Sequence, residues 1–372
     1  MKVLLTGGAG FIGSHLSDPL LTAGHSVRAL DSLDPQVHSS SARPDYLDPA
    51  VELIVGDIRD HSAVSRALEG IEAVVHLSAA VGVGQSTYEI ERYTSINALG
   101  TAVLLEQVLE CRDSIRKVLV ASSMSIYGEG QYRNPRAGEG GLAPALRSPA
   151  QLEARQWDVL GEDGLALEPE PTSESKPLRP TSIYSIGKRD HEEMVLSVGA
   201  AYGIPSVALR FFNVYGERQA LSNPYTGVAA IFASRLLNNR PPLVFEDGKQ
   251  TRDFVDVRDV ARCCELALTS DRADGANAER RHGRADLGTK HRVCNCRRSR
   301  EANRARDRGA VPGGRHSPLL WATTLAEQLL GFRAELSFEQ GMEDLLPWLA
   351  AQEPRDEVDA AQAALLERGL VR

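Results

Sequence analysis

Residues 2–13, KVLLTGGAGFIG, decide the fold of this 372-residue chain. The segment opens with a short apolar run and passes directly into a turn that holds four glycines, Gly7, Gly8, Gly10 and Gly13. Residues 15–24, HLSDPLLTAG, then have the apolar spacing of a helix. The sequence therefore predicts a strand, a glycine-rich turn and a helix, in that order.

Three glycines of this turn each have a separate physical reason to be there. Gly7 permits a tight turn, Gly10 lets backbone N–H groups approach a pyrophosphate, and Gly13 lets the helix pack closely on the strand. The anion would lie at the positive end of the helix. A tight connection without a ligand is the alternative, because glycine-rich turns also occur for purely structural reasons.

Polar residues follow the next predicted strands. SVRALD ends at Asp31, close to the spacing at which a carboxylate accepts the ribose hydroxyls of a dinucleotide, and this anion repels a 2′-phosphate. VELIVGD and AVVHLSA end at Asp57 and Ala79. Strands that alternate with helical stretches predict an α/β fold, a Rossmann-type doubly wound parallel sheet with its ligands beyond the carboxyl ends of the strands. The expected cofactor is NAD rather than NADP.

A serine-tipped strand and a Tyr-x-x-x-Lys motif supply candidate catalytic residues. RKVLVASSMSIYG (116–128) places Ser123 at a strand end, and YSIGK places Tyr184 and Lys188 four residues apart, on one helix face. A phenol with its ordinary pKa near 10 needs a neighbouring cation to act as a base, which Lys188 would provide. Ser123 would hydrogen-bond the substrate oxygen. For the motif alone, a surface helix with a solvated lysine is the alternative.

Together these motifs resemble the NAD-dependent epimerase/dehydratase family, the extended short-chain dehydrogenases/reductases. The resemblance runs from Met1 to about Gly275 and resumes from about Thr323. It implies catalytic roles for Ser123, Tyr184 and Lys188. It also implies that the following residues contact NAD: Gly7, Gly10, Phe11, Ile12, Gly13, Asp31, Asp57, Ile58 and Ala79.

Two later stretches look like the substrate-domain motifs of the nucleotide-sugar members of this family. They are RFFNVYG (210–216) and GKQTRDFVDVRDV (248–260). By this resemblance Asn213 and Arg252 would contact the nucleotide diphosphate, and a guanidinium suits two phosphates through its rigid fork. The structural alternatives are a capping asparagine and an arginine in a surface ion pair.

The resemblance also narrows the reaction. Dehydratases of the family carry an Asp-Glu pair after the Ser/Thr position, where this chain has Met124 and Ser125, neither of which is an acid or base at neutral pH. SSMSIYGEG and YTGVAAIF look most like nucleotide-sugar 4-epimerases of the dTDP-L-rhamnose 4-epimerase kind. We therefore expect 4-epimerisation through a transient keto-sugar. The alternatives are a dehydratase, a dehydrogenase/reductase with net cofactor turnover, and a non-catalytic dinucleotide sensor.

Two domains are expected from this pattern. Residues 1–209 would form the NAD-binding Rossmann domain, and residues 210–372 mainly a smaller α/β substrate-binding domain. An insertion at about 131–179, rich in Pro, Glu and Gly, separates the two catalytic elements and has weak periodicity. The pattern predicts an extended surface segment, which either covers the active site or is a mobile polar loop.

The composition changes abruptly from Glu279 to Gly309, where eleven Arg or Lys stand against four Asp or Glu. The family's Asn-Val-Gly-Thr-Gly strand end and Arg-x-Gly-Asp-x-Arg loop are missing from this region. One permitted coding of Val311 to Trp321, read one base later, gives Tyr-Arg-Ala-Gly-Asp-Ile-Arg-His-Cys-Tyr. A coding of Glu279 to Gly283 likewise gives Asn-Val-Gly-Thr-Gly. We therefore hypothesise that 279–321 is an out-of-frame translation, which would leave this polypeptide with weak or absent turnover.

Composition excludes several other classes of protein. A formal net charge of -8 argues against nucleic-acid binding, although the arginine run keeps that alternative open. No apolar run reaches the roughly 20 residues of a membrane span. Five cysteines form no disulfide framework in a chain of this size, and Cys294-x-Cys296 is too closely spaced for zinc, so we expect a cytoplasmic enzyme without a metal. The resemblance also implies a homodimer and a nucleotide-linked sugar substrate.

Overall fold

The computed structural model describes residues 1–248, 252–274, 293–296, 320–321 and 324–370. Most of the hypothesised out-of-frame segment 279–321 therefore lies outside the described residues. Among the described helices, none is both long and apolar enough to span a bilayer.

A seven-stranded parallel sheet forms the centre of the molecule, in the order β12-β9-β5-β4-β1-β2-β3. Its strands are β1 Lys2–Thr6, β2 Ser26–Asp31, β3 Glu52–Val55, β4 Ala73–His76, β5 Lys117–Ser123, β9 Ser206–Phe211 and β12 Val293–Cys296. The order reverses between β1 and β4, as in doubly wound sheets, and places the ligand crevice beyond the carboxyl ends of these strands. The predicted fold class is confirmed.

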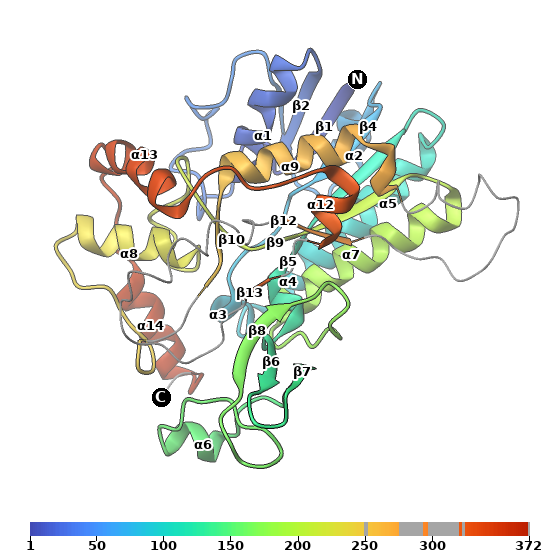
Figure 1. Cartoon of the computed structure of the whole chain (residues 1–372). Helices are drawn as coiled ribbons and strands as arrows, with labels where there is room; N and C mark the ends of the chain where they lie inside the picture. Colours follow the sequence, from blue (N-terminus) through green and yellow to red (C-terminus); the bar gives the residue numbers. More distant parts are fainter. Residues whose placement is uncertain (249–251, 275–292, 297–319, 322–323, 371–372) are drawn as a thin grey trace, which may run out of the picture.

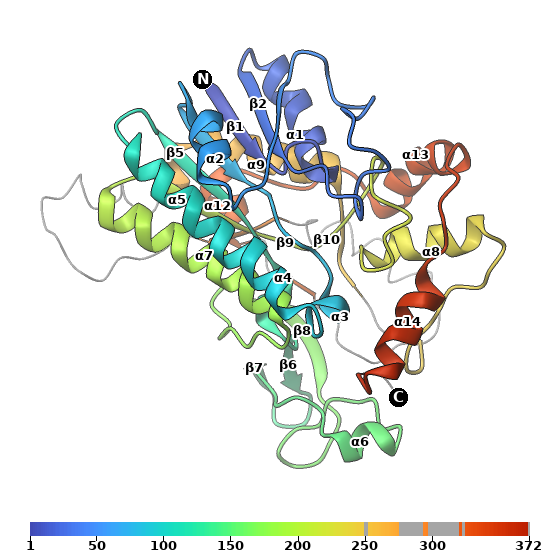
Figure 2. The same cartoon turned by 180° about the vertical axis from the view of Figure 1, so that it is seen from behind.

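Helices cover both faces of this sheet (Figures 1 and 2). On one face lie α1 Phe11–Thr22, α9 Val257–Thr269 and α12 Thr324–Leu330, and on the other lie α2 His61–Leu68, α5 Gly100–Glu110 and α7 Ile183–Tyr202. Successive side chains of a strand point to opposite faces. Val3 and Leu5 accordingly enter the core under α1, whereas Leu4 enters the core under α2 and α5.

Short elements lie along the carboxyl edge of the sheet. They are α3 Val83–Ser86, α4 Ile90–Thr94, a π-helical turn Ser95–Leu99 and a 3-10 turn at Met124–Tyr127. A further 3-10 turn, Asp271–Ala273, lies at the opposite edge, where Lys117 at the start of β5 binds Ser270 and Asp274. The π-turn joins α4 directly to α5, and π-turns inside helices frequently mark functional sites.

The insertion is more ordered than the sequence suggests. It folds into β6 Gln131–Asn134, β7 Glu139–Leu142, α6 Pro149–Glu153 and β8 Glu168–Thr172, and β13 Leu320–Trp321 pairs with β8. A small separate core of Tyr132, Val159 and Leu167 holds it together. These three apolar residues are too widely spaced along the chain to produce a periodic pattern, which explains why the sequence predicted an irregular excursion.

The remaining elements lie beside the sheet edge (Figure 1). They are the two-stranded pair β10 Asn213–Tyr215 and β11 Phe254–Asp256, and the helices α8 Val228–Leu237, α13 Phe338–Ala350 and α14 Val358–Glu367. Tyr215, Ala230 and Leu345 belong to their own apolar cluster. Although α9 follows the expected boundary at residue 209, it packs on α1 against the sheet. The division of the chain into two domains stays a prediction.

Candidate active site

The glycine turn has the close backbone packing that its sequence predicts. Gly7 has a φ of +69°, a left-handed backbone conformation that residues with a Cβ rarely adopt. A Cβ on Gly13 would lie 2.5 Å from the Gly7 carbonyl oxygen and 2.6 Å from the Cα of Gly8. Gly10 caps α1 without any side-chain hydrogen bond, so the helix presents backbone N–H groups at its first turn, where Phe11 and Ile12 lie.

Asp31 lies at the end of β2 and is 8% exposed. Its carboxylate accepts hydrogen bonds from the backbone N–H of Ala9 (3.0 Å) and of Leu33 (3.0 Å), and His38 Nε2 lies 3.6 Å away. It therefore holds the glycine turn in place as well as carrying a negative charge at the sheet edge. The sequence did not reveal this second role.

Asp57, after β3, is bound by the guanidinium of Arg59, whose Nε and Nη2 donate to its two oxygens at 2.9 and 2.6 Å. These hydrogen bonds lower the pKa of Asp57. The next residue, Ile58, is buried and lies so close to Gly100 that a Cβ there would be 2.6 Å from its Cγ2. The structure thus places Asp57 at the same edge as Asp31 and Ile58 in the core behind it.

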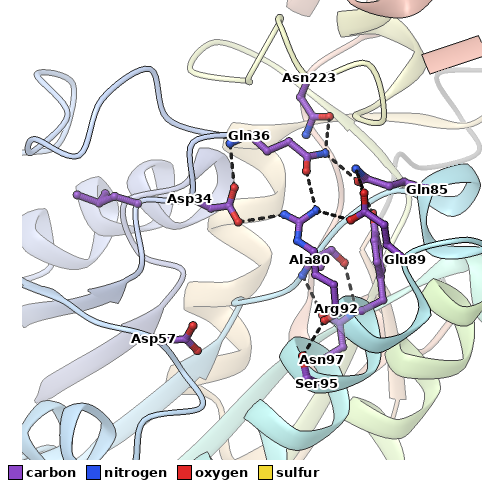
Figure 3. Close-up of polar contacts among 12 residues, drawn as sticks. Asp34, Gln36, Asp57, Ala80, Gln85, Glu89, Arg92, Ser95, Asn97 and Asn223 are labelled. Atoms are coloured by element: carbon purple, nitrogen blue, oxygen red, sulfur yellow. Dashed lines mark hydrogen bonds and ion pairs between the residues drawn. The ribbon is translucent and has the colours of Figure 1, made fainter. Parts of the chain in front are cut away.

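The loop after β4 carries Ala79 and is fixed by an asparagine that the sequence did not single out. Asn97, in the π-turn, accepts from the backbone N–H of Ala80 (2.8 Å) and donates to the Ala80 carbonyl oxygen (3.2 Å). Asn97 is fully buried. The polar contacts of this edge are drawn in Figure 3.

Arg92 connects α4 to the loop after β2 at the carboxyl edge of the sheet (Figure 3). Its guanidinium donates to Asp34 at 3.0 Å, to the Gln36 side-chain oxygen at 2.8 Å and to Glu89 at 2.9 Å. Gln36 in turn donates to Asn223 at 3.2 Å, from the stretch between β10 and α8. The sequence offered no signal for this network because its three segments, around Asp34, Arg92 and Asn223, are far apart in the chain.

The predicted catalytic residues are brought together by β5 and α7. The Ser123 hydroxyl, at the end of β5, accepts from the backbone N–H of Ser125 at 3.1 Å and from the Ser125 hydroxyl at 2.9 Å. Tyr184, in the first turn of α7, lies close enough to Ser123 for the two side chains to interact. Burial raises the pKa of the Tyr184 phenol, and the interaction with Ser123 acts in the opposite direction.

Lys188 lies one turn further along α7 and is 4% exposed. Its ammonium group donates to the carbonyl oxygen of Ala121 at 3.0 Å, so the side chain points back to β5. Burial lowers the pKa of Lys188 to about 7. A capping box between Ser182 and Ser185 starts the helix and fixes where both motif residues leave it.

The two predicted substrate residues are also neighbours. The backbone N–H and the side-chain amide of Asn213 both donate to the carbonyl oxygen of Asp253, at 3.4 and 3.2 Å, and Asp253 follows Arg252 in the chain. The same amide lies 3.5 Å from the sulfur of Met124, the residue after Ser123. Asn213 therefore links the catalytic strand end to the Arg252 segment.

The NAD dependent epimerase/dehydratase family model matches residues 3–148 and 161–279. The chain belongs to this family. A dTDP-L-rhamnose 4-epimerase of Burkholderia thailandensis is 33% identical to this family member over 362 residues, which cover 94% of this chain and 95% of that protein.

Solved structures with the same fold include two UDP-glucose 4-epimerases. The enzyme of Thermotoga maritima with UDP-glucose superposes with a TM-score of 0.67 and 25% identity, over 94% of this chain and 99% of that chain. The enzyme of Thermus thermophilus in complex with NAD gives a TM-score of 0.67 and 25% identity, over 95% of this chain and 100% of that one. The cofactor of this family is NAD, as the sequence predicts.

The sheet edge of this family member fits NAD. Gly13 packs directly on the backbone of Gly7 and Gly8, the N-terminus of α1 has no capping side chain, and the Asp31 carboxylate lies at the same edge. The turn that Gly7 and Gly13 shape would hold the pyrophosphate against the backbone at Gly10, and Asp31 would bind the adenosine ribose. The individual contacts of Phe11, Ile12, Asp57, Ile58 and Ala79 with the cofactor stay predictions.

A buried histidine pair beneath Lys188 was missed by the sequence reasoning. Thr101 donates to the carbonyl oxygen of Asn97 (2.6 Å), so its hydroxyl accepts from His76 Nε2 (2.9 Å). His76 Nδ1 then accepts from Thr6 (2.7 Å), which makes His76 a neutral imidazole. Burial, aided by the charge of Lys188, lowers its pKa to about 3.

His191, one turn after Lys188, packs on His76 with ring centroids 4.9 Å apart, and burial lowers the pKa of His191 well below its usual value. Both rings therefore stay neutral near Lys188 and do not add to its charge.

Proposed function

We propose that this chain is an NAD-dependent nucleotide-sugar epimerase that inverts C4 of its sugar through a transient keto-sugar. The observation that carries this proposal is the convergence of Tyr184 and Lys188 of α7 on β5 at the carboxyl edge of the sheet, where Tyr184 faces Ser123 and Lys188 donates to the Ala121 carbonyl oxygen. The 4-epimerase relatives support the choice of reaction.

The roles of the three residues follow from their chemistry. Tyr184 removes the proton of the sugar hydroxyl, Ser123 holds the same oxygen by a hydrogen bond, and the nearby Lys188 cation stabilises the phenolate. NAD, when bound, supplies a reversible acceptor for the hydride of the sugar carbon. Return of that hydride to the other face of the carbon inverts the centre and leaves no net change in the cofactor.

Dehydration is the weaker alternative because no carboxylate stands where the dehydratases of the family carry theirs. Met124 contacts Asn213, and the Ser125 hydroxyl donates a hydrogen bond to the Ser123 hydroxyl. Neither side chain can protonate a leaving hydroxyl at neutral pH. A non-catalytic dinucleotide sensor would need no contact between Ser123 and Tyr184.

The experiment is a Tyr184→Phe variant assayed on a panel of nucleotide sugars by product NMR and by NADH absorbance. The variant and its control are made in the present chain and in a version translated in the shifted frame between about Gly275 and Trp321. We expect the frame-shifted version to form an epimer without net NADH, and Tyr184→Phe to lose turnover while it still binds NAD. Tyr202→Phe, at the exposed end of the same helix, is the matched control and should keep full activity. Full turnover by Tyr184→Phe would refute the mechanism, and net NADH release would indicate a dehydrogenase.

The frame of 279–321 decides how active this polypeptide is. The family match ends at residue 279, where the basic stretch begins, and this supports the hypothesis of an out-of-frame translation. We expect a version translated in the shifted frame between about Gly275 and Trp321 to turn over faster than the present chain. Resequencing of the gene is the direct check, and an in-frame reading that gives the present sequence would remove the hypothesis.

We further propose that the enzyme is a cytoplasmic homodimer. The helices beside Tyr184 support this, because Ile186 on α7 and Leu99 before α5 are apolar side chains that are 43% and 54% exposed. Sedimentation of the purified protein gives its oligomeric state, and a monomer at micromolar concentration would contradict the dimer.

A further inference from the structure

The insertion reaches the neighbourhood of Arg252 through one arginine. Arg147, between β7 and α6, forms a two-pronged ion pair with Glu246, its Nη1 and Nη2 each 2.9 Å from a carboxylate oxygen. Its Nη1 also donates to the carbonyl oxygen of Trp157 at 3.2 Å. The side chains of Arg147 and Glu246 are only 15% and 17% exposed, unlike most of the insertion's charged residues.

Arg147 belongs to a cluster of charges beside the catalytic strand end. Arg252 is within electrostatic reach of Arg147, Glu246, Glu129 and Tyr132. The Arg252 segment is joined through Asn213 to Met124, as described above. The insertion thus contributes a second guanidinium to the place where the nucleotide diphosphate is expected.

The Glu246 carboxylate binds the Arg147 guanidinium in the way that a phosphate group would. A guanidinium binds carboxylate and phosphate oxygens in the same two-pronged manner. Glu246 also has a backbone φ of +54°, a left-handed conformation that costs a residue with a Cβ about 1–2 kcal/mol.

We propose that Arg147 is a substrate-binding residue that, together with Arg252, takes the diphosphate of the nucleotide-linked substrate, and that Glu246 is a resident anion which the diphosphate displaces. This assignment rests on the proposed function, because it deepens the same site. It also gives the insertion a role, since the insertion carries a ligand to the substrate.

The experiment measures calorimetric affinity for UDP and dTDP, the probes for the diphosphate, with the full-length protein in the presence of NAD. If the ion pair only stabilises the site, loss of either Arg147 or Glu246 should weaken nucleotide binding. If Glu246 is a displaceable anion, loss of Arg147 should weaken binding and loss of the Glu246 charge should strengthen it. We expect Arg147→Met to bind the better of the two nucleotides about 10-fold or more weakly, since charged hydrogen bonds are lost. We expect Glu246→Gln to bind it about 3- to 10-fold more tightly, because a competing anion is removed.

Arg133→Met is the matched control. Arg133 forms an ion pair with Glu168 in the same insertion, but both side chains are about half exposed, and the affinity should stay unchanged. Arg147→Lys keeps the charge without the fork and should fall between wild type and Arg147→Met. Thermal unfolding of each variant shows whether it is folded.

The assignment is wrong if wild type and Arg147→Met bind the nucleotide equally well. It is also wrong if Arg147→Met and Glu246→Gln both bind more weakly, because the ion pair would then have a purely structural role. If the wild type binds neither UDP nor dTDP, the nucleotide-sugar function fails with it. If the wild type binds one of them and the Arg147 variants bind it equally well, only the role of Arg147 fails.

Discussion

Lys188 makes the pH dependence of stability a direct test of the proposed site. The side chain is 4% exposed, and burial lowers its pKa from an ordinary 10.5 to about 7. Between pH 7 and pH 10.5 the unfolded chain keeps a proton that the folded chain has released, so stability rises with pH across this range. Below pH 7 both states are protonated, and the folded state bears the full cost of the buried cation.

The magnitude follows from the same values. The gap between 10.5 and about 7 corresponds to about 5 kcal/mol at about 1.4 kcal/mol for each pKa unit. Lys188→Met removes this cost, but it also removes the hydrogen bond to the Ala121 carbonyl oxygen, worth about 1–3 kcal/mol at any pH. The variant should therefore be more stable than the wild type at pH 6, and its advantage should shrink by about 3 kcal/mol by pH 9.5.

Urea unfolding followed by circular dichroism at pH 6, 8 and 9.5 measures this difference. Tyr184→Phe serves as the control, because it retains Lys188 in the same buried position and should keep the wild-type pH profile. A difference between Lys188→Met and wild type that is constant within about 1 kcal/mol from pH 6 to 9.5 would refute the reasoning, since it would show that Lys188 does not change its protonation on folding.

Two further predictions concern packing. Gly13→Ala places a Cβ within 2.6 Å of backbone atoms of the turn, so NAD affinity by calorimetry should fall about 10-fold or more. Gly24→Ala, whose Cβ would meet no atom within 4 Å but whose φ of +79° disfavours alanine, should lose stability and still bind NAD normally. Glu192→Gln breaks the buried pair with Arg210, both side chains being about 5% exposed or less, and should cost about 3–5 kcal/mol in urea unfolding. Glu193→Gln, in an exposed pair on the same helix, should cost less than about 1 kcal/mol. Normal NAD binding by Gly13→Ala, or equal costs for the two glutamate variants, would contradict these estimates.

Much of the fold and part of the site can be predicted from local patterns of the sequence. The glycine turn, Asp31 and the four-residue spacing of Tyr184 and Lys188 each depend on neighbours in the chain, because a turn, a strand end and a helix face are local structures. The parallel sheet also follows from the alternation of strands and helices. Family resemblance then supplied the expected roles.

Other features exist only because the chain folds back on itself. The pair His76 and His191 meets where β4 passes under α7, and Arg147 meets Glu246 across 99 positions of sequence. No spacing rule connects such residues, since their contacts are set by how sheet, helices and insertion pack. The sequence by itself determined the dinucleotide fold and the catalytic motif, and only the tertiary structure decided what surrounds Lys188 and which charges of the insertion reach the Arg252 segment. The reason is that burial and ion pairing arise from packing between distant segments.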